Sequence, residues 1–196
     1  MHSSQGYSYA GLDKYDAVAE GLGLRHYGCL AHCRQYFDKA AKVTELPSGR
    51  SLARVALEEF LKKVYAIERK VKALRKAAES SGVAPLAEIL ALRQKEAVPL
   101  MAAFKQWVDD LLPGVPPKTA LGKALAYTTR QWEKLSRFLS DPEMPADNNY
   151  CENQIRPFAV GRRSWLFVDS QLGAKASANL YSIVMTCRAN GIEPYA

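Results

Sequence analysis

Apolar side chains recur at helical spacing over most of the 196-residue chain. Between residues 12 and 22, apolar positions return every three or four residues until Gly21 and Gly23, which predicts a first helix. Residues 24–30 have the apolar and aromatic character of a short buried strand, and residues 31–43 then resume the helical pattern. A strand followed by a helix indicates an α/β core at this end of the chain.

The middle of the chain has a helical pattern throughout. Gly82, Pro85 and the proline-rich residues 112–117 divide it into three long pieces. Over residues 52–74 an apolar face repeats for many turns and the charged side chains lie largely away from it, which predicts a long amphipathic helix packed on its neighbours. Residues 121–139 form a further amphipathic stretch. We expect this part to be an all-helical insertion.

The last part of the chain combines turn-forming and helical signals. Residues 147–149, Asp-Asn-Asn, can cap a helix that carries Glu152, and Pro157 is predicted to interrupt that helix. Residues 165–168 have the pattern of a short strand or hairpin arm. Residues 174–191 predict a last helix that ends at its final glycine.

Composition narrows the class of protein. With 48% hydrophobic and 24% charged residues, the chain fits one globular domain or a domain with a large insertion. It has no run of about 18 apolar residues, and the first residues lack the pattern of a signal peptide. We therefore expect a cytoplasmic protein without a membrane partner.

The net charge of +7, with an isoelectric point near 9.2, favours a polyanionic partner such as DNA or RNA. Between residues 50 and 76 there are nine Lys and Arg against three Glu. Two interpretations stay open for this basic stretch: a solvated helix face with pairs four residues apart, or a surface that contacts the DNA backbone.

The four cysteines, Cys29, Cys33, Cys151 and Cys187, are too few and too scattered for a secreted disulfide scaffold, so reduced thiols are expected. Residues 29–33 (CLAHC) resemble part of a metal site, but structural zinc needs four ligands and no second Cys/His pair lies nearby. The alternative is that these cysteines are small buried residues beside a strand end.

Several blocks resemble those of a known family. Residues 147–157 (DNNYCENQIRP) and 160–167 (VGRRSWLF) closely resemble the D-N-N-x-x-E-x-x-I/L-R-P and G-R-K/R-x-W-L-F blocks of insertion-sequence-66 family transposases. Residues 15–18 (YDAV) and 26–37 (HYGCLAHCRQYF) look like the family's Y-D-A and G-C-W-A-H-x-R-R-x-F blocks. The ending at residues 190–195 (NGIEPY) also matches.

This resemblance implies an RNase H-like core with an all-helical insertion before the last catalytic helix. The expected fold class is α/β, a partial RNase H-like core that is mostly α. Residues 1–43 would be a helix-strand-helix part of that core and residues 44–142 the insertion. Residues 143–196 would carry the final catalytic Glu, a short strand or hairpin and the last helix.

The resemblance also implies metal-dependent DNA strand cleavage and joining by an Asp-Asp-Glu set. Such chemistry uses two Mg²⁺ or Mn²⁺ ions about 3.5–4 Å apart, held by carboxylates from different elements. By resemblance Glu152 is the final Glu, both a catalytic residue and a metal ligand. The alternative is a surface glutamate of a helix.

The first two carboxylates are not in place. The family's first Asp lies upstream of anything in this sequence, and the position of the second is Ala10 or, in a shifted alignment, Gln5. Asp13 would need an irregular register to replace it. One carboxylate is too few for two cations. The resemblance therefore implies a transposase fragment that is inactive by itself.

Four arginines in the resembling blocks could bind DNA phosphates through forked N–H donors: Arg34, Arg156, Arg162 and Arg163. Structural pairing with Asp or helix carbonyls is the alternative. His32 could orient a metal ligand or contact DNA, or it could simply be packed. The expected partners are DNA and other transposase subunits or a second copy. The alternative function is a non-catalytic DNA-binding or transposase-interacting module.

Overall fold

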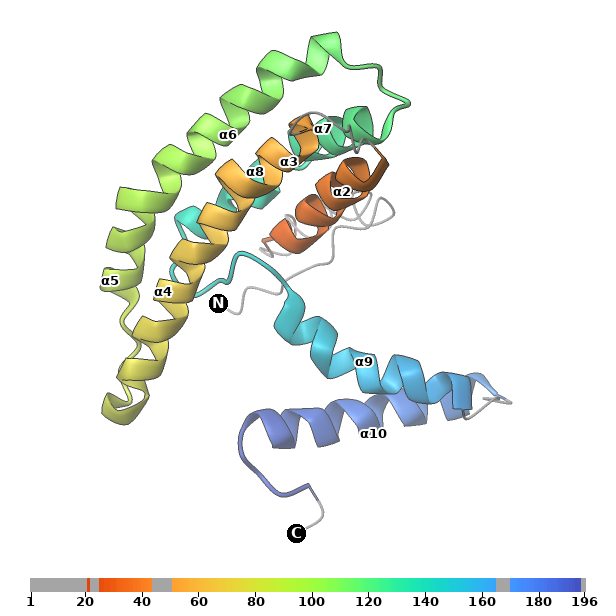
Figure 1. The fold of residues 1–196 in the computed structure, drawn as a ribbon. Coiled ribbons are helices and arrows are strands. Elements are labelled where there is room, and N and C mark those ends of the chain that lie inside the picture. The colour runs from red at the N-terminus through yellow and green to blue at the C-terminus, as the bar shows by residue number, and fades with distance from the viewer. Residues whose placement is uncertain (1–20, 22–24, 44–50, 165–169, 195–196) are drawn as a thin grey trace. The chain divides into compact units, whose positions relative to one another are not determined.

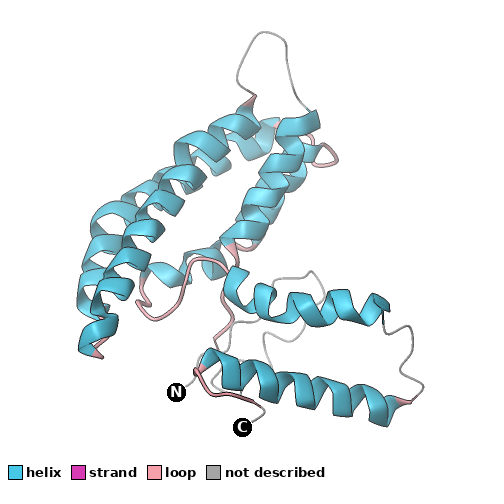
Figure 2. Ribbon diagram, turned by 60° about the horizontal axis from the view of Figure 1, so that its bottom comes forward, coloured by secondary structure: helices cyan, strands magenta, loops and turns pink. Residues whose placement is uncertain are grey.

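The computed structural model describes residue 21 and residues 25–43, 51–164 and 170–194 (Figure 1). These residues form helices joined by loops and turns (Figure 2). They belong to two compact units, one that ends at Asn148 and one that starts at Asn149.

The predicted α/β class, with a partial RNase H-like core, is wrong for this structure, because the described residues are about four-fifths helical and include no strand. The predicted strand at residues 24–30 has no regular structure over residues 25–29. Its backbone bonds go to two different segments, from the Gly28 amide to the Lys134 carbonyl and from the Leu30 amide to the Ala146 carbonyl. Single bonds to separate segments cannot make the repeated ladder of a sheet. The predicted strand at residues 165–168 lies outside the described residues, as does nearly all of the first helix.

The core of the first unit forms around the pair α2 (Leu30–Val43) and α7 (Ala120–Arg130). The helix predicted over residues 31–43 is confirmed as α2. Its buried side chains return at helical spacing: Leu30, Cys33, Phe37, Ala40 and Ala41. In α7, Thr119 caps the first turn through the Gly122 amide.

The predicted amphipathic helix is confirmed as one continuous rod, made of α3 (Leu52–Val55), the π-helical turn η2 (Ala56–Leu61) and α4 (Lys62–Ala78). Ser51 caps its first turn. The face toward the core consists of Ala53, Ala56, Leu61, Val64, Ile67 and Val71. Leu52 was expected on this face but is 43% exposed. The short 3₁₀ turn η3 (Glu79–Ser81) then leads to Gly82, whose φ of 67° ends the rod in a left-handed conformation.

A second rod runs back beside the first and consists of α5 (Leu86–Leu92), the π-helical turn η4 (Arg93–Ala97) and α6 (Val98–Leu111) (Figure 1). In η4 the Val98 amide donates to the Arg93 carbonyl, five residues back. Pro99 follows at once and has no N–H to donate. A wide turn just before this proline lets the rod continue without a break.

Aromatic rings join the rods to α2 and to α8 (Trp132–Ser136). The Phe104 ring on α6 has four aromatic neighbours with centroids 5.2–6.3 Å away: Phe37, Phe60, Trp107 and Trp132. The helix predicted over residues 121–139 is broken at Gln131, where α7 ends and α8 begins. The 3₁₀ turn η6 (Arg137–Leu139) completes this segment.

Arg93 is the largest fully buried side chain of the first unit that carries a charge. Its Nε and Nη2 donate to the two Glu68 carboxylate oxygens at 2.9 and 2.7 Å. Its Nη1 donates to the carbonyls of Phe138 and Asp141, both at 2.8 Å. The guanidinium also lies 5.1 Å from the Phe138 ring centroid. One side chain thus fastens both rods to residues 138–141.

The second unit contains α9 (Asn149–Ser164) and α10 (Gln171–Ala189). The predicted interruption at Pro157 is wrong, because α9 continues through this residue. The proline removes a single backbone donor, which one helix can tolerate. The predicted last helix is confirmed, although Ser170 caps it three residues earlier than expected, and it ends before Gly191 at φ 67°. The Tyr181 hydroxyl donates to the Gln154 carbonyl at 2.7 Å.

We predict that Arg93→Met lowers the free energy of unfolding by about 3–5 kcal/mol in urea denaturation. Methionine keeps much of the side-chain volume, so the loss comes from Glu68, whose side chain is only 14% exposed, and from two carbonyls without their donor.

Lys63→Gln is the control, since Lys63 pairs with Glu59 four residues away at an exposed site. It should change the free energy of unfolding by less than about 0.5 kcal/mol. Equal losses in the two variants would contradict the role given to Arg93.

Candidate functional site

Two sequence blocks that lie more than a hundred residues apart meet in the first unit. The Asn148 amide donates to the Cys29 sulfur at 3.4 Å, and the Leu30 amide donates to the Ala146 carbonyl at 3.0 Å. These contacts set the start of the 147–157 block against the start of α2. The fold thus places the first two residues of the 147–157 block beside the 26–37 block.

Gly28 sits where the chain before α2 touches α8. A Cβ on Gly28 would lie 2.7 Å from the backbone nitrogen of Leu135 and 3.0 Å from its Cα. These are backbone atoms, which cannot move aside as the end of a flexible side chain can. The Gly28 amide also donates to the Lys134 carbonyl at 2.8 Å. The close approach explains why glycine stands before Cys29.

Tyr65 connects α4 with the same block, because its hydroxyl is hydrogen-bonded to the Asp147 carboxylate. Burial, followed by the negative charge of Asp147, raises the pKa of Tyr65 above its usual value. The Arg34 guanidinium on α2 lies 5.9 Å from the centroid of the tyrosine ring. Sequence reasoning did not select Tyr65. Its only signal was a polar hydroxyl within an otherwise charged or apolar helix.

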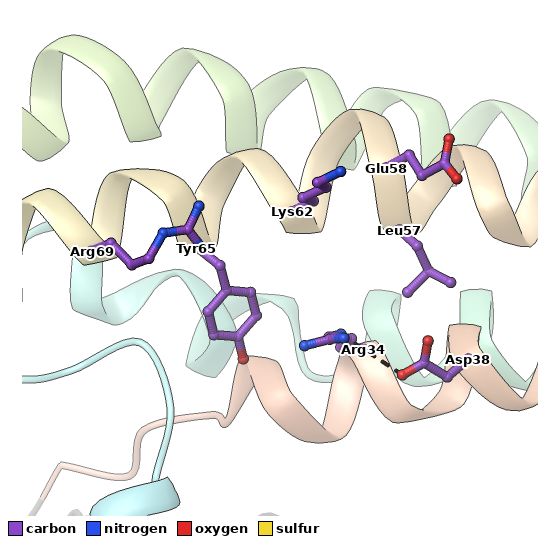
Figure 3. A pocket seen from close by; sticks show the side chains of 7 residues that line it. All are labelled: Arg34, Asp38, Leu57, Glu58, Lys62, Tyr65 and Arg69. Carbon is purple, nitrogen blue, oxygen red and sulfur yellow. Dashed lines mark ion pairs between the residues drawn. The ribbon is translucent and has the colours of Figure 1, made fainter.

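A groove of about 310 Å³ opens beside Tyr65, between α2 and the rod of η2 and α4 (Figure 3). Its lining consists of Arg34, Asp38, Leu57, Glu58, Lys62, Tyr65 and Arg69. Figure 3 shows Arg69 beside Tyr65 at one end of the groove and Asp38, Leu57 and Glu58 at the other end, with Lys62 and Arg34 between them. The groove is therefore polarised, with its positive end beside Tyr65.

The predicted DNA-binding residue Arg34 lies at this groove. Its Nε is 3.7 Å from the Asp38 carboxylate, and more than two-fifths of each side chain is exposed. An ion pair this exposed contributes little to stability, and it leaves the Arg34 guanidinium able to bind a second anion. His32 lies half-buried in the first turn of α2.

The other predicted site residues lie on α9 in the second unit. Glu152 is half-buried in the first turn, where a negative charge favours the helix through its dipole. Arg156 is exposed, one turn further on, and forms no ion pair with another described residue. Arg162 and Arg163 fall in the last turn, and their side chains lie outside the described part of the structure.

Asn148 was expected among the residues that could cap the helix of Glu152. Its side chain is 4% exposed, and neither the amide oxygen nor the amide nitrogen has a hydrogen-bond partner within the described residues. Asn148 therefore does not cap α9.

The donor set does not fit a pair of magnesium ions in the part of the chain that the structure describes. There, no three His, Cys, Asp or Glu side chains come close enough to hold one cation. A magnesium pair needs several carboxylate oxygens on the same site. Asp13, the residue considered as a substitute for the second Asp, lies outside the described residues.

Cys29 and Cys33 were also considered as metal ligands, and their surroundings do not suit that role. Both are buried free thiols, and Cys33 Sγ lies 3.3 Å from the Thr128 hydroxyl. Burial raises the pKa of Cys29 and raises that of Cys33 to about 12. Thiols that stay protonated at neutral pH are poor metal ligands and poor nucleophiles.

Comparison with known proteins gives the family. The model of the Transposase IS66 family matches residues 6–176. The chain belongs to the IS66 transposase family. The match includes the groove and the whole of α9, and with them both blocks that meet at Cys29 and Asn148.

Three relatives come from Sinorhizobium fredii. The uncharacterized protein y4jD is 30% identical over 96% of this chain and 34% of its own length. The uncharacterized protein y4hP is 30% identical over 92% of this chain and 32% of its own length, and y4qI is 26% identical over 96% and 33%. No solved structure matches. This IS66 family chain thus spans about a third of the length of the curated relatives it matches.

Within the described residues, no helix of this IS66 family chain is long and apolar enough to cross a membrane.

We predict that Gly28→Ala lowers the free energy of unfolding by about 1–3 kcal/mol, because the added methyl meets backbone atoms of Leu135. Gly114→Ala is the control, since a Cβ at Gly114 meets nothing within 4 Å. Urea denaturation of both variants measures the difference. A Gly28 variant as stable as the Gly114 variant would show that α8 moves aside freely.

We also predict that Cys33 makes stability depend on pH in the alkaline range. The folded thiol has a pKa of about 12 and the unfolded thiol about 9, so folding favours the protonated form. This contribution is complete below about pH 9 and is lost as the pH rises toward 12. Urea denaturation at pH 8 to 10.5 should therefore show a steeper loss of stability in the wild type than in Cys33→Ala. Parallel curves would contradict the raised pKa.

Proposed function

We propose that this chain is the part of an IS66 family transposase that supplies the final carboxylate of the catalytic set, Glu152, together with contacts to DNA. The observation that carries this proposal is the block at residues 147–157, which lies wholly inside the family match. The reaction class is metal-dependent cleavage and joining of DNA strands.

In the complete enzyme we propose Mg²⁺ or Mn²⁺ as the cofactor, with Glu152 as one ligand. The described residues provide no second and third carboxylate near one another. The chain also spans about a third of its relatives, so the other ligands would come from sequence that those relatives have in addition. We therefore propose that the isolated chain does not cut DNA.

The proposed DNA contacts are Arg34, Arg156, Arg162 and Arg163. Two observations support Arg34 and Arg156. Arg156 is exposed without an ion pair to a described residue, and Arg34 is held only by the open pair with Asp38. An arginine fork binds phosphate oxygens through two parallel N–H donors, which fixes position without reading sequence.

A second candidate is a module that binds DNA, or another transposase subunit, without any catalytic part. The net charge of +7 favours it, since counterion release alone can drive binding to a duplex. This candidate differs from the first in one respect: Glu152 would have no catalytic partner in any assembly.

We predict that the purified chain binds a DNA duplex with an affinity that falls as salt rises, and that it does not nick supercoiled plasmid in Mg²⁺ or Mn²⁺. Glu152→Gln should behave identically in the plasmid assay, because a lone carboxylate cannot hold two cations. Agarose gels and fluorescence anisotropy measure the two properties.

Nicking that disappears in Glu152→Gln would overturn the incomplete-site proposal and point to a carboxylate such as Asp13. Absence of duplex binding even at low salt would overturn the proposed DNA contacts. To separate the two candidates, the longer relative y4jD and its matching Glu→Gln variant are both assayed for strand transfer: activity in the unchanged protein that the variant lacks supports the catalytic assignment of the block.

A further inference from the structure

The basic side chains of α4 fall into two sets that the sequence does not distinguish. Three of them are already bound: Lys63 to Glu59 at 2.8 Å, Lys70 to Glu96 at 2.6 Å, and Arg75 to the carbonyls of Pro142 and Glu143 at 2.6 and 3.0 Å. Lys70 and Arg75 thereby connect α4 with other segments of the first unit, whereas Lys63 and Glu59 pair within one rod. The positive charges of Lys63 and Lys70 are each offset by a carboxylate.

The second set lies on one stripe of the helix. Its members are Lys62, Arg69, Lys72 and Lys76, at spacings of seven, three and four residues. Such spacing keeps side chains on one helical face. All four are exposed, and none forms an ion pair or side-chain hydrogen bond with another residue in the described ranges.

Two members of the stripe, Lys62 and Arg69, line the groove from α4, and Arg34 lines it from α2 (Figure 3). The Arg34 guanidinium lies 5.9 Å from the centroid of the tyrosine ring and also pairs with Asp38, which lies with Glu58 toward the other end. The tyrosine end therefore carries an excess of positive charge, and Tyr65 places it beside Asp147.

The shape of the stripe decides which anion fits. From Lys62 to Lys76 the helix rises by roughly 21 Å at 1.5 Å per residue. A single phosphate ion would need cations that converge on one point, whereas these four are spread along a line. A line of unpaired cations of this length matches a chain of phosphates, such as the backbone of a duplex.

We propose that the stripe of Lys62, Arg69, Lys72 and Lys76, extended by Arg34 across the groove, is the surface on which this chain holds the sugar-phosphate backbone of DNA. The inference rests on the proposed function and deepens it, because it names one helix face for the contact. It also assigns α4, a helix outside the catalytic block, to positioning DNA next to Asp147.

The test compares two fourfold variants that lose the same charge. The first is Lys62→Gln/Arg69→Gln/Lys72→Gln/Lys76→Gln. The matched control removes three lysines and one arginine that are exposed on other elements: Lys95→Gln/Lys118→Gln/Lys123→Gln/Arg130→Gln. Circular dichroism melts of the full-length variants establish that both are folded. Anisotropy with a labelled 20-base-pair duplex over a series of NaCl concentrations then gives the affinity and its salt dependence.

The expected result is a shallower salt dependence in the stripe variant only. Each phosphate contact contributes about 0.9 to the slope of log affinity against log salt, so losing four contacts lowers the slope by about 3 to 4. The control should change it by less than about 1. Equal slopes in the two variants, with duplex binding intact in the wild type, would overturn this inference and leave the proposed function standing. A wild type that binds no duplex would overturn both.

A third variant, Arg156→Gln/Arg162→Gln/Arg163→Gln, decides which of the two units binds the DNA backbone. If it alone lowers the slope, the backbone is bound by α9 and the assignment of the α4 stripe is wrong. If only the stripe variant lowers it, the stripe carries the contact.

Discussion

The buried guanidinium of Arg93 is the contact on which the first unit depends. Its bidentate pair with Glu68 joins the two helical rods, and its bonds to the Phe138 and Asp141 carbonyls hold the segment that leads to residue 147. A fully buried charge is tolerated only when its hydrogen-bond donors are satisfied, and here Nε, Nη1 and Nη2 of Arg93 each donate to an oxygen. Arg75 and Gln94 add bonds to the carbonyls of neighbouring residues in the same segment. Side chains of both rods thus hold residues 138–143, in addition to bonds within the segment such as that from the Glu143 amide to the Asp141 carboxylate.

That constraint gives the two helical rods a role in placing the 147–157 block. Because residues 138–148 are held against the rods and against Cys29, the start of the family's 147–157 block has a fixed place in the first unit. Tyr65 adds a bond from the first turn of α4 to Asp147. Two residues of the basic stripe, Lys62 and Arg69, also line the groove beside Tyr65. The rods therefore both support the start of the block and carry the positive charge that our proposals assign to DNA.

The second unit is organised differently. α9 and α10 form a helix pair in which α10 has no buried residue, and large apolar side chains such as Leu172, Leu180 and Ile183 are more than half exposed. The α/β core expected from the family resemblance is not what the described residues form. Strands need partners for their backbone groups, and here the Gly28 amide bonds to α8 and the Leu30 amide to Ala146 instead.

The sequence by itself determined the family and the helices of the middle, because both depend on local pattern: block spacing for the family, and apolar periodicity with glycine and proline breaks for the rods. It also identified Glu152 and the four arginines as candidates, which stay predictions. Only the tertiary structure decided which cations of α4 are bound and which are free, since partners such as Glu96 and Pro142 lie far away in sequence. It likewise decided that residues 25–29 form no strand and that α9 continues through Pro157. Periodicity reports which face of an element is apolar, but it carries no information about what that face and its charges will meet.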